Sequence, residues 1–274
     1  MPEGDTIFRA ARTLHRALAG RTVTRFESAL PTLTRVHEDT PVTGRTIESV
    51  SARGKHLLMA FSGDLLLRTH MRMNGSWHIY RPGERWLRPR SDMRIVVAVD
   101  GFVAVGFNIP DAEWLTPAAL RRNRPLQSLG PDLLAEDFDV EEVIGRVVAR
   151  RDGVVADVLL DQRVMAGIGN VYKSEVLFAC GVNPFAAVHA LGIEQVRCLV
   201  STARRFLRAN VTDGLAAMTT YAGFRRTTRR DDPAERLWVY GRGGKPCRRC
   251  GTAIAVQKHG AGVRLTYWCP ACQP

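Results

Sequence analysis

The chain begins with Met1-Pro2-Glu3, which could place a reactive amine next to a carboxyl group. Enzymatic removal of Met1, which a small second residue permits, would leave Pro2 with a free secondary amine. A neutral amine attacks a carbonyl-type carbon and forms an iminium ion, which serves as an electron sink for elimination. Glu3 could move protons at the same centre. The alternative interpretation is an ordinary chain start without a chemical role.

Four of the six cysteines form the strongest local pattern. Cys247 and Cys250 make one C-x-x-C pair, and Cys269 and Cys272 make a second pair 18 residues further on. Each pair supplies two thiolates from a tight turn, and four thiolates match a closed tetrahedral zinc site. One structural Zn²⁺ without a catalytic role is therefore expected, and no organic cofactor. Two disulfides are the alternative, which an intracellular location disfavours.

Three further patterns could bind phosphate. Lys55 follows a glycine just before a strand-like run, where it could also act as an acid or be an ordinary edge-strand lysine. The glycine turn Gly167-Ile-Gly-Asn170 separates two helical patterns, and Asn170 is a natural N-cap. Backbone N–H groups at a helix start bind phosphate, although glycine turns between helices are common. Arg264 lies on the alternating strand of the cysteine hairpin, from which it could reach a phosphate.

The elements expected to position these residues fall into two halves. A helix is predicted near the start of the chain, capped by Asp5 or Thr6 and ended by Gly20, and short β-type runs follow from about 22 to 105. Closely spaced strands of this kind favour a β-sandwich. Helical patterns come next, and a basic stretch precedes the cysteine hairpin. The predicted apolar helix face is Ile7, Ala10, Ala11, Leu14 and Leu18, and the later helical patterns are 140–150, 154–165, 171–180 and 193–210.

Arginine dominates the charge of this 274-residue chain. Lys+Arg is 39 and Asp+Glu is 27, so the formal net charge is 39 − 27 = +12. Only four of the 39 are lysines, which leaves 39 − 4 = 35 arginines. The guanidinium group is a good fork for phosphate oxygens, so a polyanionic partner is expected. A GC-rich genome is the alternative explanation of the same composition.

Two absences bear on the compartment. The sequence contains no run of about 18 apolar residues, so no membrane partner is expected. The start of the chain lacks a basic segment followed by an apolar one, so no secretory signal is expected. An intracellular, reducing compartment follows as the default. Cys180 and Cys198, which lie among apolar neighbours, are then expected to be buried thiols.

Together these residues resemble the Fpg/Nei family of DNA glycosylases, which comprises formamidopyrimidine-DNA glycosylase and endonuclease VIII. The similarity runs nearly end to end, because several motifs occur in the family's order. The Met-Pro-Glu-Gly start and the tryptophan after Gly75-Ser76 favour the Nei branch. The motifs are Met1-Pro-Glu3, Gly54-Lys-His56, His70-Met-Arg-Met-Asn-Gly75, Leu160-Asp-Gln with Gly167-Ile-Gly-Asn-Val-Tyr172, Val239-Tyr-Gly-Arg242, and the zinc hairpin with Arg264-Leu-Thr-Tyr267.

The resemblance implies a bifunctional enzyme that removes an oxidised base and then cuts the strand as an abasic-site (AP) lyase. Pro2 would attack C1′ of the damaged nucleotide, and Glu3 would be the proton donor and shuttle. Lys55 would assist elimination beside the scissile phosphates. Arg264 would grip phosphate around the lesion and support the second elimination. The expected products are a one-nucleotide gap and phosphate ends, formed by β,δ-elimination.

Other residues would contact DNA without entering the reaction. The resemblance implies that Gly169 and Asn170 bind phosphate and that His70 contacts the backbone. Met73 would fill the gap that the extruded nucleotide leaves, because the target must leave the base stack before C1′ can be reached. The expected partner is damaged duplex DNA, with single-stranded or bubble DNA as further substrates. The expected location is the bacterial cytoplasm, in association with the nucleoid, and the simplest oligomeric state is a monomer.

The sequence departs from the family pattern at three places. Thr6 replaces a glutamate that is common in the family, with only Asp5 nearby. The Fpg loop that reads the opposite base with arginine and phenylalanine corresponds to 103–110, which has no arginine and offers only Phe107 as a partial substitute. This departure favours oxidised pyrimidines over 8-oxoguanine. The gap between the cysteine pairs is slightly longer than expected, which could shift Arg264.

The resulting prediction is an α+β protein of two domains. It comprises an N-terminal β-sandwich flanked by helices and a C-terminal helix–two-turns–helix (H2TH) domain with a zinc-ribbon β-hairpin. The alternatives are an Fpg-type enzyme for 8-oxoguanine and formamidopyrimidine, a non-catalytic protein that binds damaged DNA, and a zinc-ribbon protein that binds RNA. The predicted segments are a catalytic domain over 1–122, a linker over 123–130, an H2TH domain over 131–236 and a zinc hairpin over 237–274.

Overall fold

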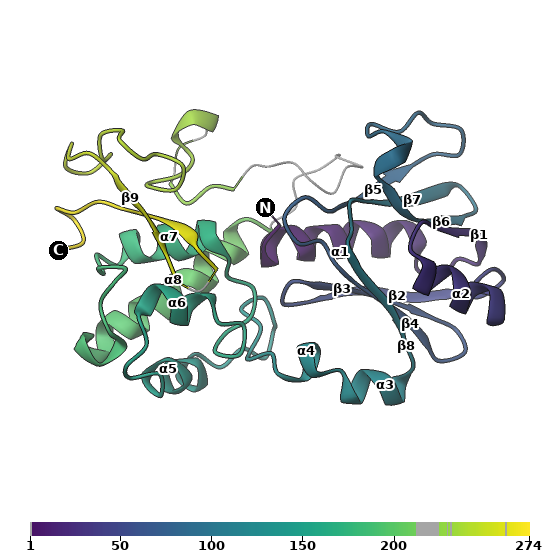
Figure 1. Ribbon diagram of the computed structural model, residues 1–274, viewed down its shortest axis with the longest axis horizontal. Helices are drawn as coiled ribbons and strands as arrows, with labels where there is room; N and C mark the ends of the chain where they lie inside the picture. The colour runs from purple at the N-terminus through teal and green to yellow at the C-terminus, as the bar shows by residue number, and fades with distance from the viewer. Residues whose placement is uncertain (1, 212–224, 229, 231, 261) are drawn as a thin grey trace. The chain divides into compact units, whose positions relative to one another are not determined.

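The computed structural model describes residues 2–211, 225–228, 230, 232–260 and 262–274 (Figure 1). These residues form two compact units, one that ends at Gln127 and one that begins at Ser128. The division falls inside the predicted linker, which contains the short helix α4 (Arg124–Gln127). The limits of the predicted domains stay predictions. Within the described residues, no helix has the length and apolarity to cross a membrane.

The first unit contains two antiparallel four-stranded sheets. Most of the strands carry apolar residues at alternate positions, which gives each sheet a face that can be buried. The predicted sandwich is therefore present, with more strands than the periodicity alone indicated. One sheet has the order β1 (Val23–Ser28), β6 (Met93–Val99), β7 (Phe102–Phe107), β5 (Ser76–Tyr80), and the other has the order β2 (Ile47–Arg53), β3 (His56–Phe61), β4 (Leu65–His70), β8 (Asp111–Leu115).

Helix α1 (Gly4–Leu18) lies between the two sheets (Figure 1). The five apolar residues of its predicted face are all buried, and they share one core with side chains of both sheets. The predicted cap is wrong, because Glu3 is the N-cap and the helix starts two residues before Thr6. The backbone carbonyl of Glu3 accepts the N–H groups of Thr6 and Ile7, at 2.9 and 3.1 Å. The buried start of α1 thus fixes the position of Glu3 and of Pro2 before it.

A second, smaller core covers the outer face of the β1-β6-β7-β5 sheet. Tyr80 and Phe107 project from this face, and Trp86 of the loop between β5 and β6 packs against them. The loop is therefore fixed onto the sheet. Three helices and a short 3₁₀ turn complete the unit: α2 (Pro31–Asp39), α3 (Pro117–Arg122), α4, and η1 (Arg90–Asp92).

The second unit is built from helices and one β-hairpin. The four predicted helices are present, three with shorter bounds and one, α7, shifted by one residue, and their apolar faces form a common core. The hairpin pairs β9 with β10 in antiparallel register, from Arg264 opposite His259 to Trp268 opposite Ala255. The elements are α5 (Val140–Val148), α6 (Val155–Leu160), α7 (Asn170–Ala179), α8 (Ile193–Ala209), β9 (Ala255–His259) and β10 (Arg264–Trp268), with 3₁₀ turns η2 (Val188–Ala190) and η3 (Pro233–Glu235).

The prediction of two buried thiols at Cys180 and Cys198 is wrong, because the two residues form a disulfide. Cys180 caps the end of α7, and Cys198 lies in the second turn of α8, against which α7 packs. Their Cα atoms are 5.9 Å apart, within the range that a disulfide spans. Sequence spacing gave no sign of this pair, since it depends on how the two helices pack.

Candidate functional site

A cavity of about 330 Å³ opens beside Pro2 in the first unit. Its size is within the range of sites that hold small organic groups. The cavity brings together Pro2 and Met73, two residues that the sequence analysis selected separately. Its other lining residues were not selected, and they come from the β4–β5 turn, from the first residue of β5, and from the loops that follow β5 and β7. The lining residues are Pro2, Met73, Asn74, Gly75, Ser76, Arg88 and Asn108.

The carboxyl groups next to Pro2 lie deep in the protein. The Glu3 side chain is fully buried, and so is that of Asp5 in the first turn of α1. Asp5 accepts a hydrogen bond from Thr6 Oγ1 at 3.3 Å and lies 3.7 Å from an arginine nitrogen of Arg9. The Asp5 carboxylate is thus paired with a neighbour on its own helix. The helix start holds Glu3 next to the cavity residue Pro2.

A tight turn between β4 and β5 presents Met73. The side chain is 58% exposed, whereas Met71, two residues before it, is buried in the core. The N–H group of Gly75 donates to the carbonyl oxygen of Met71 at 2.8 Å. A Cβ atom on Gly75 would lie only 2.4 Å from that oxygen, so the turn requires glycine at this position. An exposed apolar side chain on a rigid turn is suited to insertion between bases.

Lys55 lies in the two-residue turn that joins β2 to β3. Gly54 supplies the positive φ of 58° that this turn needs, and Arg53 pairs with His56 on its two sides. His56 in turn pairs with His70 at the end of β4, where the two imidazole rings meet edge to face at 4.9 Å. The predicted turn before a strand is present, and it places Lys55 close to His70.

Both histidines at this end of the sheet are neutral near pH 7. Burial, followed by the neighbouring His70 and Arg68, lowers the pKa of His56 to about 3. Burial, followed by the charge of Arg72, lowers the pKa of His70 to about 4. The Nδ1 atom of His70 accepts the backbone N–H of Arg72 at 3.1 Å. The proton of the neutral ring is therefore on Nε2, which can donate to an anionic group.

Sequence reasoning missed the buried cation behind these histidines. Arg68 is only 5% exposed and donates to Asp111, His56 and Glu113. Burial alone would raise the pKa of Asp111, but the hydrogen bond and charge of Arg68, with the charge of Arg72, lower it overall. Arg68 looked like one arginine among many in the sequence. Its partners on β8 lie more than 40 residues away, so no local pattern identifies them.

Asn170 in the second unit does not cap its helix as predicted. Gly169 is the N-cap of α7, and Asn170 is the first helical residue. The side-chain amide of Asn170 donates to the carbonyl oxygen of Leu265 at 2.8 Å and accepts from Lys173 Nζ at 2.7 Å. Lys173, which is 1% exposed, also donates to Thr266 Oγ1 at 2.8 Å. The start of α7 therefore holds the strand on which Arg264 is the first residue.

A buried carboxylate, also missed by sequence reasoning, anchors the segment that leads into the cysteine hairpin. Glu175 on α7 is fully buried and accepts the hydroxyl of Thr227 and three consecutive backbone N–H groups, from Trp238 to Tyr240, at 2.8–2.9 Å. Burial raises the pKa of Glu175, although these hydrogen bonds oppose the shift. The Val-Tyr-Gly-Arg motif begins in this segment, so part of the motif serves to attach the hairpin to α7.

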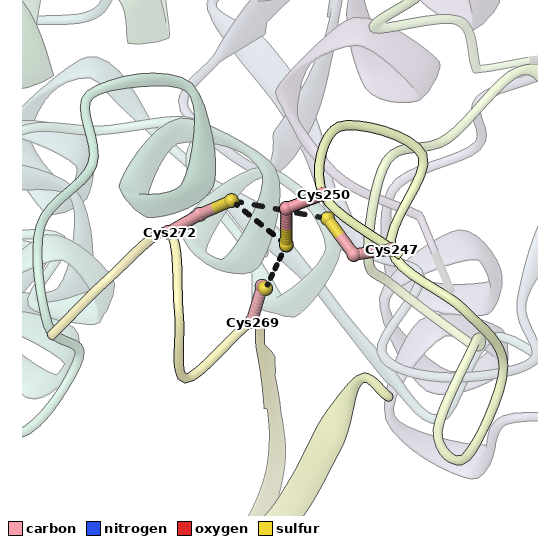
Figure 2. Close-up of side chains that lie close together, drawn as sticks. All are labelled: Cys247, Cys250, Cys269 and Cys272. Atoms are coloured by element: carbon pink, nitrogen blue, oxygen red, sulfur yellow. Dashed lines mark hydrogen bonds between the residues drawn. The ribbon is translucent and has the colours of Figure 1, made fainter. Parts of the chain in front are cut away.

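The four hairpin cysteines converge on one point (Figure 2). Their sulfur atoms all lie within 4.8 Å of one another, and three of the separations are 3.4, 3.5 and 4.0 Å. Zinc–sulfur bonds of about 2.3 Å in a tetrahedron place sulfur atoms about 3.8 Å apart. Cys247 and Cys269 are buried, whereas Cys250 is exposed. The donor set thus fits one Zn²⁺ with all four positions taken by protein.

Phe107 cannot substitute for the phenylalanine with which the Fpg loop contacts the opposite base. The residue lies in β7, is fully buried, and packs edge to face on His78 and Trp86. It therefore belongs to the outer core of the sheet and is not available to contact an opposite base. Its neighbour Asn108 is the residue that reaches the cavity, with a φ of 49° that asparagine tolerates better than most residues.

Three family profiles match the chain in order. A profile described as the formamidopyrimidine-DNA glycosylase N-terminal domain matches residues 1–112. The formamidopyrimidine-DNA glycosylase H2TH domain profile matches 129–221, and a zinc finger found in FPG and IleRS matches 244–274. The predicted fold class and the four-cysteine zinc-binding site are confirmed.

Two relatives and one solved structure extend the comparison. A Streptomyces coelicolor protein named probable endonuclease 8 2 is 41% identical over 100% of this chain and 94% of its own length. The Mycolicibacterium smegmatis protein named DNA-(apurinic or apyrimidinic site) lyase Nei2 is 38% identical over 100% of this chain and 99% of its own length. The Lactococcus lactis Fpg (MutM), solved with an oxidised-pyrimidine-containing DNA, has a TM-score of 0.83 and covers 99% of each chain at 23% identity, which shows a shared fold.

Proposed function

The chain belongs to the formamidopyrimidine-DNA glycosylase/endonuclease VIII family, and we propose that it removes oxidised pyrimidines from DNA through a Schiff base on Pro2. Its relatives with 38–41% identity carry endonuclease 8 2 and Nei2 names. The enzyme is a Nei-like DNA glycosylase and AP lyase of base excision repair. The preferred base, the nucleophile and the elimination pattern are the proposed part.

One observation carries this proposal: Pro2 and the exposed Met73 line the same cavity. A nucleotide extruded from duplex DNA leaves a gap in the stack, and an apolar side chain can fill it. The cavity next to that side chain would then receive the extruded nucleotide. An amine in this cavity is well placed to reach C1′ of that nucleotide.

The proposed reaction proceeds in three balanced steps. The Pro2 nitrogen forms a bond to C1′ while the glycosidic C–N bond breaks, and the base leaves with the electron pair and a proton. The sugar ring then opens to an iminium ion, and Glu3, held next to Pro2, supplies the proton that O4′ takes up. Glu3, now a carboxylate, takes up a C2′ proton as the 3′ phosphate is expelled. Loss of a further sugar proton to water expels the 5′ phosphate, and hydrolysis of the iminium bond by water releases Pro2.

Residues of both units would bind the flanking phosphates. Lys55 and His70 lie close together at one end of the β3–β4 ladder, and the neutral His70 ring keeps an Nε2–H donor. Lys55 would stabilise the departing phosphate during elimination. In the second unit, Gly169 at the N-cap of α7, Asn170 and the hairpin residue Arg264 would hold phosphates, and Zn²⁺ would cross-link the two turns that support this hairpin.

The preference for pyrimidines rests on what the Fpg-like loop lacks. Positions 103–110 contain no arginine, and the one phenylalanine considered as a substitute is buried. A protein without these side chains has no evident way to select cytosine opposite the lesion, as an 8-oxoguanine enzyme must. The relatives named endonuclease 8 2 and Nei2 agree with this preference.

The test compares two 30-base-pair duplexes that differ only in the lesion, thymine glycol in one and 8-oxoguanine opposite cytosine in the other. Single-turnover excision should be at least ten times faster for thymine glycol. Faster excision of 8-oxoguanine would replace the pyrimidine proposal by the Fpg-type function. Binding of both duplexes without excision or strand cleavage would reject the enzymatic proposal as a whole.

A further inference from the structure

A chain of buried hydroxyl and imidazole groups ends at the cavity beside Pro2. Ser76, His78 and Tyr80 occupy alternate positions of β5, so their side chains share one face of the sheet. They are only 3%, 6% and 2% exposed. Ser76 Oγ lies 3.0 Å from His78 Nε2, and His78 Nδ1 lies 2.9 Å from the hydroxyl of Tyr80. Ser76, at the end of this chain, lines the cavity.

The direction of these hydrogen bonds follows from the group at the far end. The backbone N–H of Leu87 donates to the Tyr80 hydroxyl at 3.1 Å, and an N–H group can only donate. The Tyr80 oxygen accepts this bond. The Tyr80 hydroxyl is buried, and among the described residues His78 Nδ1 is the one acceptor within hydrogen-bond distance for its hydrogen, so this hydrogen goes to His78. A neutral imidazole accepts at one nitrogen and donates at the other. The neutral ring therefore accepts from Tyr80 at Nδ1 and donates from Nε2 to Ser76.

His78 is in the neutral form that this direction requires. Burial, followed by the charge of Arg88, lowers the pKa of His78 to about 4. Arg88, another residue that lines the cavity, is half-buried in the loop that Tyr80 holds through Leu87. At neutral pH, the direction of the hydrogen bonds that the Leu87 N–H sets at Tyr80 therefore continues through the His78 ring to Ser76 at the cavity.

The hydroxyl hydrogen of Ser76 is left for a ligand. The Ser76 oxygen accepts from His78, and the part of the chain that the structure describes provides no acceptor for the Ser76 hydrogen. A buried hydroxyl without an acceptor loses a hydrogen bond that it would make in water. Because the residue lines the cavity, a bound group with an acceptor atom would restore that bond. Arg88 adds a second group on the same wall that can only donate.

We propose that Ser76 and Arg88 bind carbonyl oxygens of the extruded base, and so select damaged bases of the 2,4-dioxopyrimidine class. Tyr80 and His78 are positioning residues that fix the Ser76 hydroxyl as a donor. A base derived from uracil or thymine presents two carbonyl acceptors, whereas a cytosine-type base presents an amino donor in place of one. This inference deepens the proposed function and rests on it, because it assigns the cavity beside Pro2 to the damaged base.

The test separates base recognition from chemistry at the sugar. Ser76→Ala and Ser76→Thr are compared with wild type on a duplex with 5-hydroxyuracil and on a duplex with a preformed abasic site. Ser76→Ala should excise 5-hydroxyuracil about tenfold more slowly in single turnover, the effect of one lost neutral hydrogen bond. Its lyase rate at the abasic site should stay within twofold of wild type. Ser76→Thr keeps the hydroxyl and should recover most of the excision rate.

A double mutant tests the chain behind Ser76. Tyr80→Phe should also slow excision. The Ser76→Ala/Tyr80→Phe protein should be no slower than Ser76→Ala alone, because both changes remove the same oriented donor, the Ser76 hydroxyl. Additive losses of excision rate would assign Tyr80 a role independent of Ser76. They would overturn the inference that Tyr80 and His78 orient the Ser76 hydroxyl. Ser91 is an exposed serine that takes no part in the Ser76–His78–Tyr80 hydrogen bonds. Ser91→Ala should leave excision unchanged and serves as the control.

The outcomes also separate this inference from the proposed function. Equal losses of excision and lyase rates in Ser76→Ala would show that Ser76 maintains the cavity as a whole, and unchanged rates would show that it does not touch the base. Either result in the variant overturns the inference, whereas the proposed function stands as long as the wild-type enzyme has lyase activity. If wild type itself has no activity at the abasic site, the proposed function fails instead.

Discussion

The side-chain amide of Asn170 donates to the backbone carbonyl of Leu265 at 2.8 Å, across 95 residues of sequence. This bond joins the start of α7 to the strand that begins with Arg264. Lys173 strengthens the junction, since its ammonium group bonds Asn170 and Thr266. Asn170 and Arg264, which we propose as phosphate-binding residues from two separate motifs, are thereby parts of one hydrogen-bonded structure. Their positions are coupled, so a substitution at Asn170 should change the position of Arg264.

We predict that Asn170→Ala and Arg264→Ala differ in stability but agree in activity. Asn170→Ala leaves the Leu265 carbonyl and the buried Lys173 ammonium each short of one partner, which should cost about 2–3 kcal/mol of unfolding free energy. Arg264 is exposed, so its removal should change stability by less than about 0.5 kcal/mol. Both variants should yield more β-elimination and less δ-elimination product. Urea unfolding and gel analysis of the cleaved ends measure the two effects, and equal stability of the variants would contradict the coupling.

Zinc retention should distinguish a cysteine that binds the metal from Arg264, which we propose binds phosphate. Cys250→Ser removes one of four thiolates and should release most of the metal and disorder the hairpin. Arg264→Ala should keep one zinc per chain. A colorimetric chelator after mild denaturation gives the zinc content, and near-ultraviolet circular dichroism reports the packing of Trp238 and Tyr267 beside the cysteines. Equal zinc loss in the two variants would contradict this division.

Three histidines, two of them buried and His70 partly buried, should make the first unit less stable as the pH falls. The pKa values of His56, His70 and His78 lie at about 3, 4 and 4 in the folded protein, below the ordinary 6.5. The unfolded chain therefore binds protons that the folded chain excludes, and stability is lost as the pH falls from about 6.5 towards 4. Each histidine should contribute about 1–2 kcal/mol to this loss between pH 7 and pH 5.

Urea unfolding at pH 7, 6 and 5 measures this dependence. His78→Gln should reduce the slope of stability against pH, because glutamine cannot take up the proton in the unfolded chain. A wild-type midpoint that does not change between pH 7 and pH 5 would contradict the assignment of neutral, buried rings.

Gly75 should be irreplaceable for a steric reason. A Cβ atom there would lie 2.4 Å from the carbonyl oxygen of Met71, so Gly75→Ala must shift the turn that presents Met73. We expect base excision to fall at least tenfold, with loss of about 1–3 kcal/mol of stability. Gly145→Ala is the matched control, since that helical glycine has no neighbour within 4 Å and should gain up to about 1 kcal/mol. Similar excision rates for the two variants would show that the turn tolerates a methyl group.

Local patterns predicted much of this molecule because their causes are local. The spacing of Ile7, Leu14 and Leu18 fixes the buried face of α1, and the C-x-x-C pairs fix the zinc ligands. Asn170 shows where such reasoning fails. An asparagine after glycine favours a helix cap, but partners at Leu265 and Lys173 outweigh that preference.

The missed residues have partners that only the fold brings near. Arg68 finds its carboxylates on β8, and Glu175 finds three N–H groups more than 60 residues away. Cys180 and Cys198 pair because α7 and α8 pack together. The Ser76 chain carried a weak sequence signal, in polar residues at alternate positions of β5, but its direction depends on the N–H of Leu87 in a separate loop. Pairings of this kind follow from tertiary structure and have no periodicity to detect.

The central claim is that the Pro2 amine forms a covalent iminium ion with the sugar, and borohydride trapping on a duplex with one abasic site tests it most directly. The comparison protein carries an uncleaved Met-Ser extension before Pro2, and the matched control carries the same two residues after the last residue of the chain. Wild type and the control should give a stable protein–DNA adduct, with Pro2 as the modified residue by mass spectrometry, whereas the extended protein should bind the duplex without an adduct. An adduct of undiminished yield in the extended protein, or one mapped to Lys55, would contradict the claim.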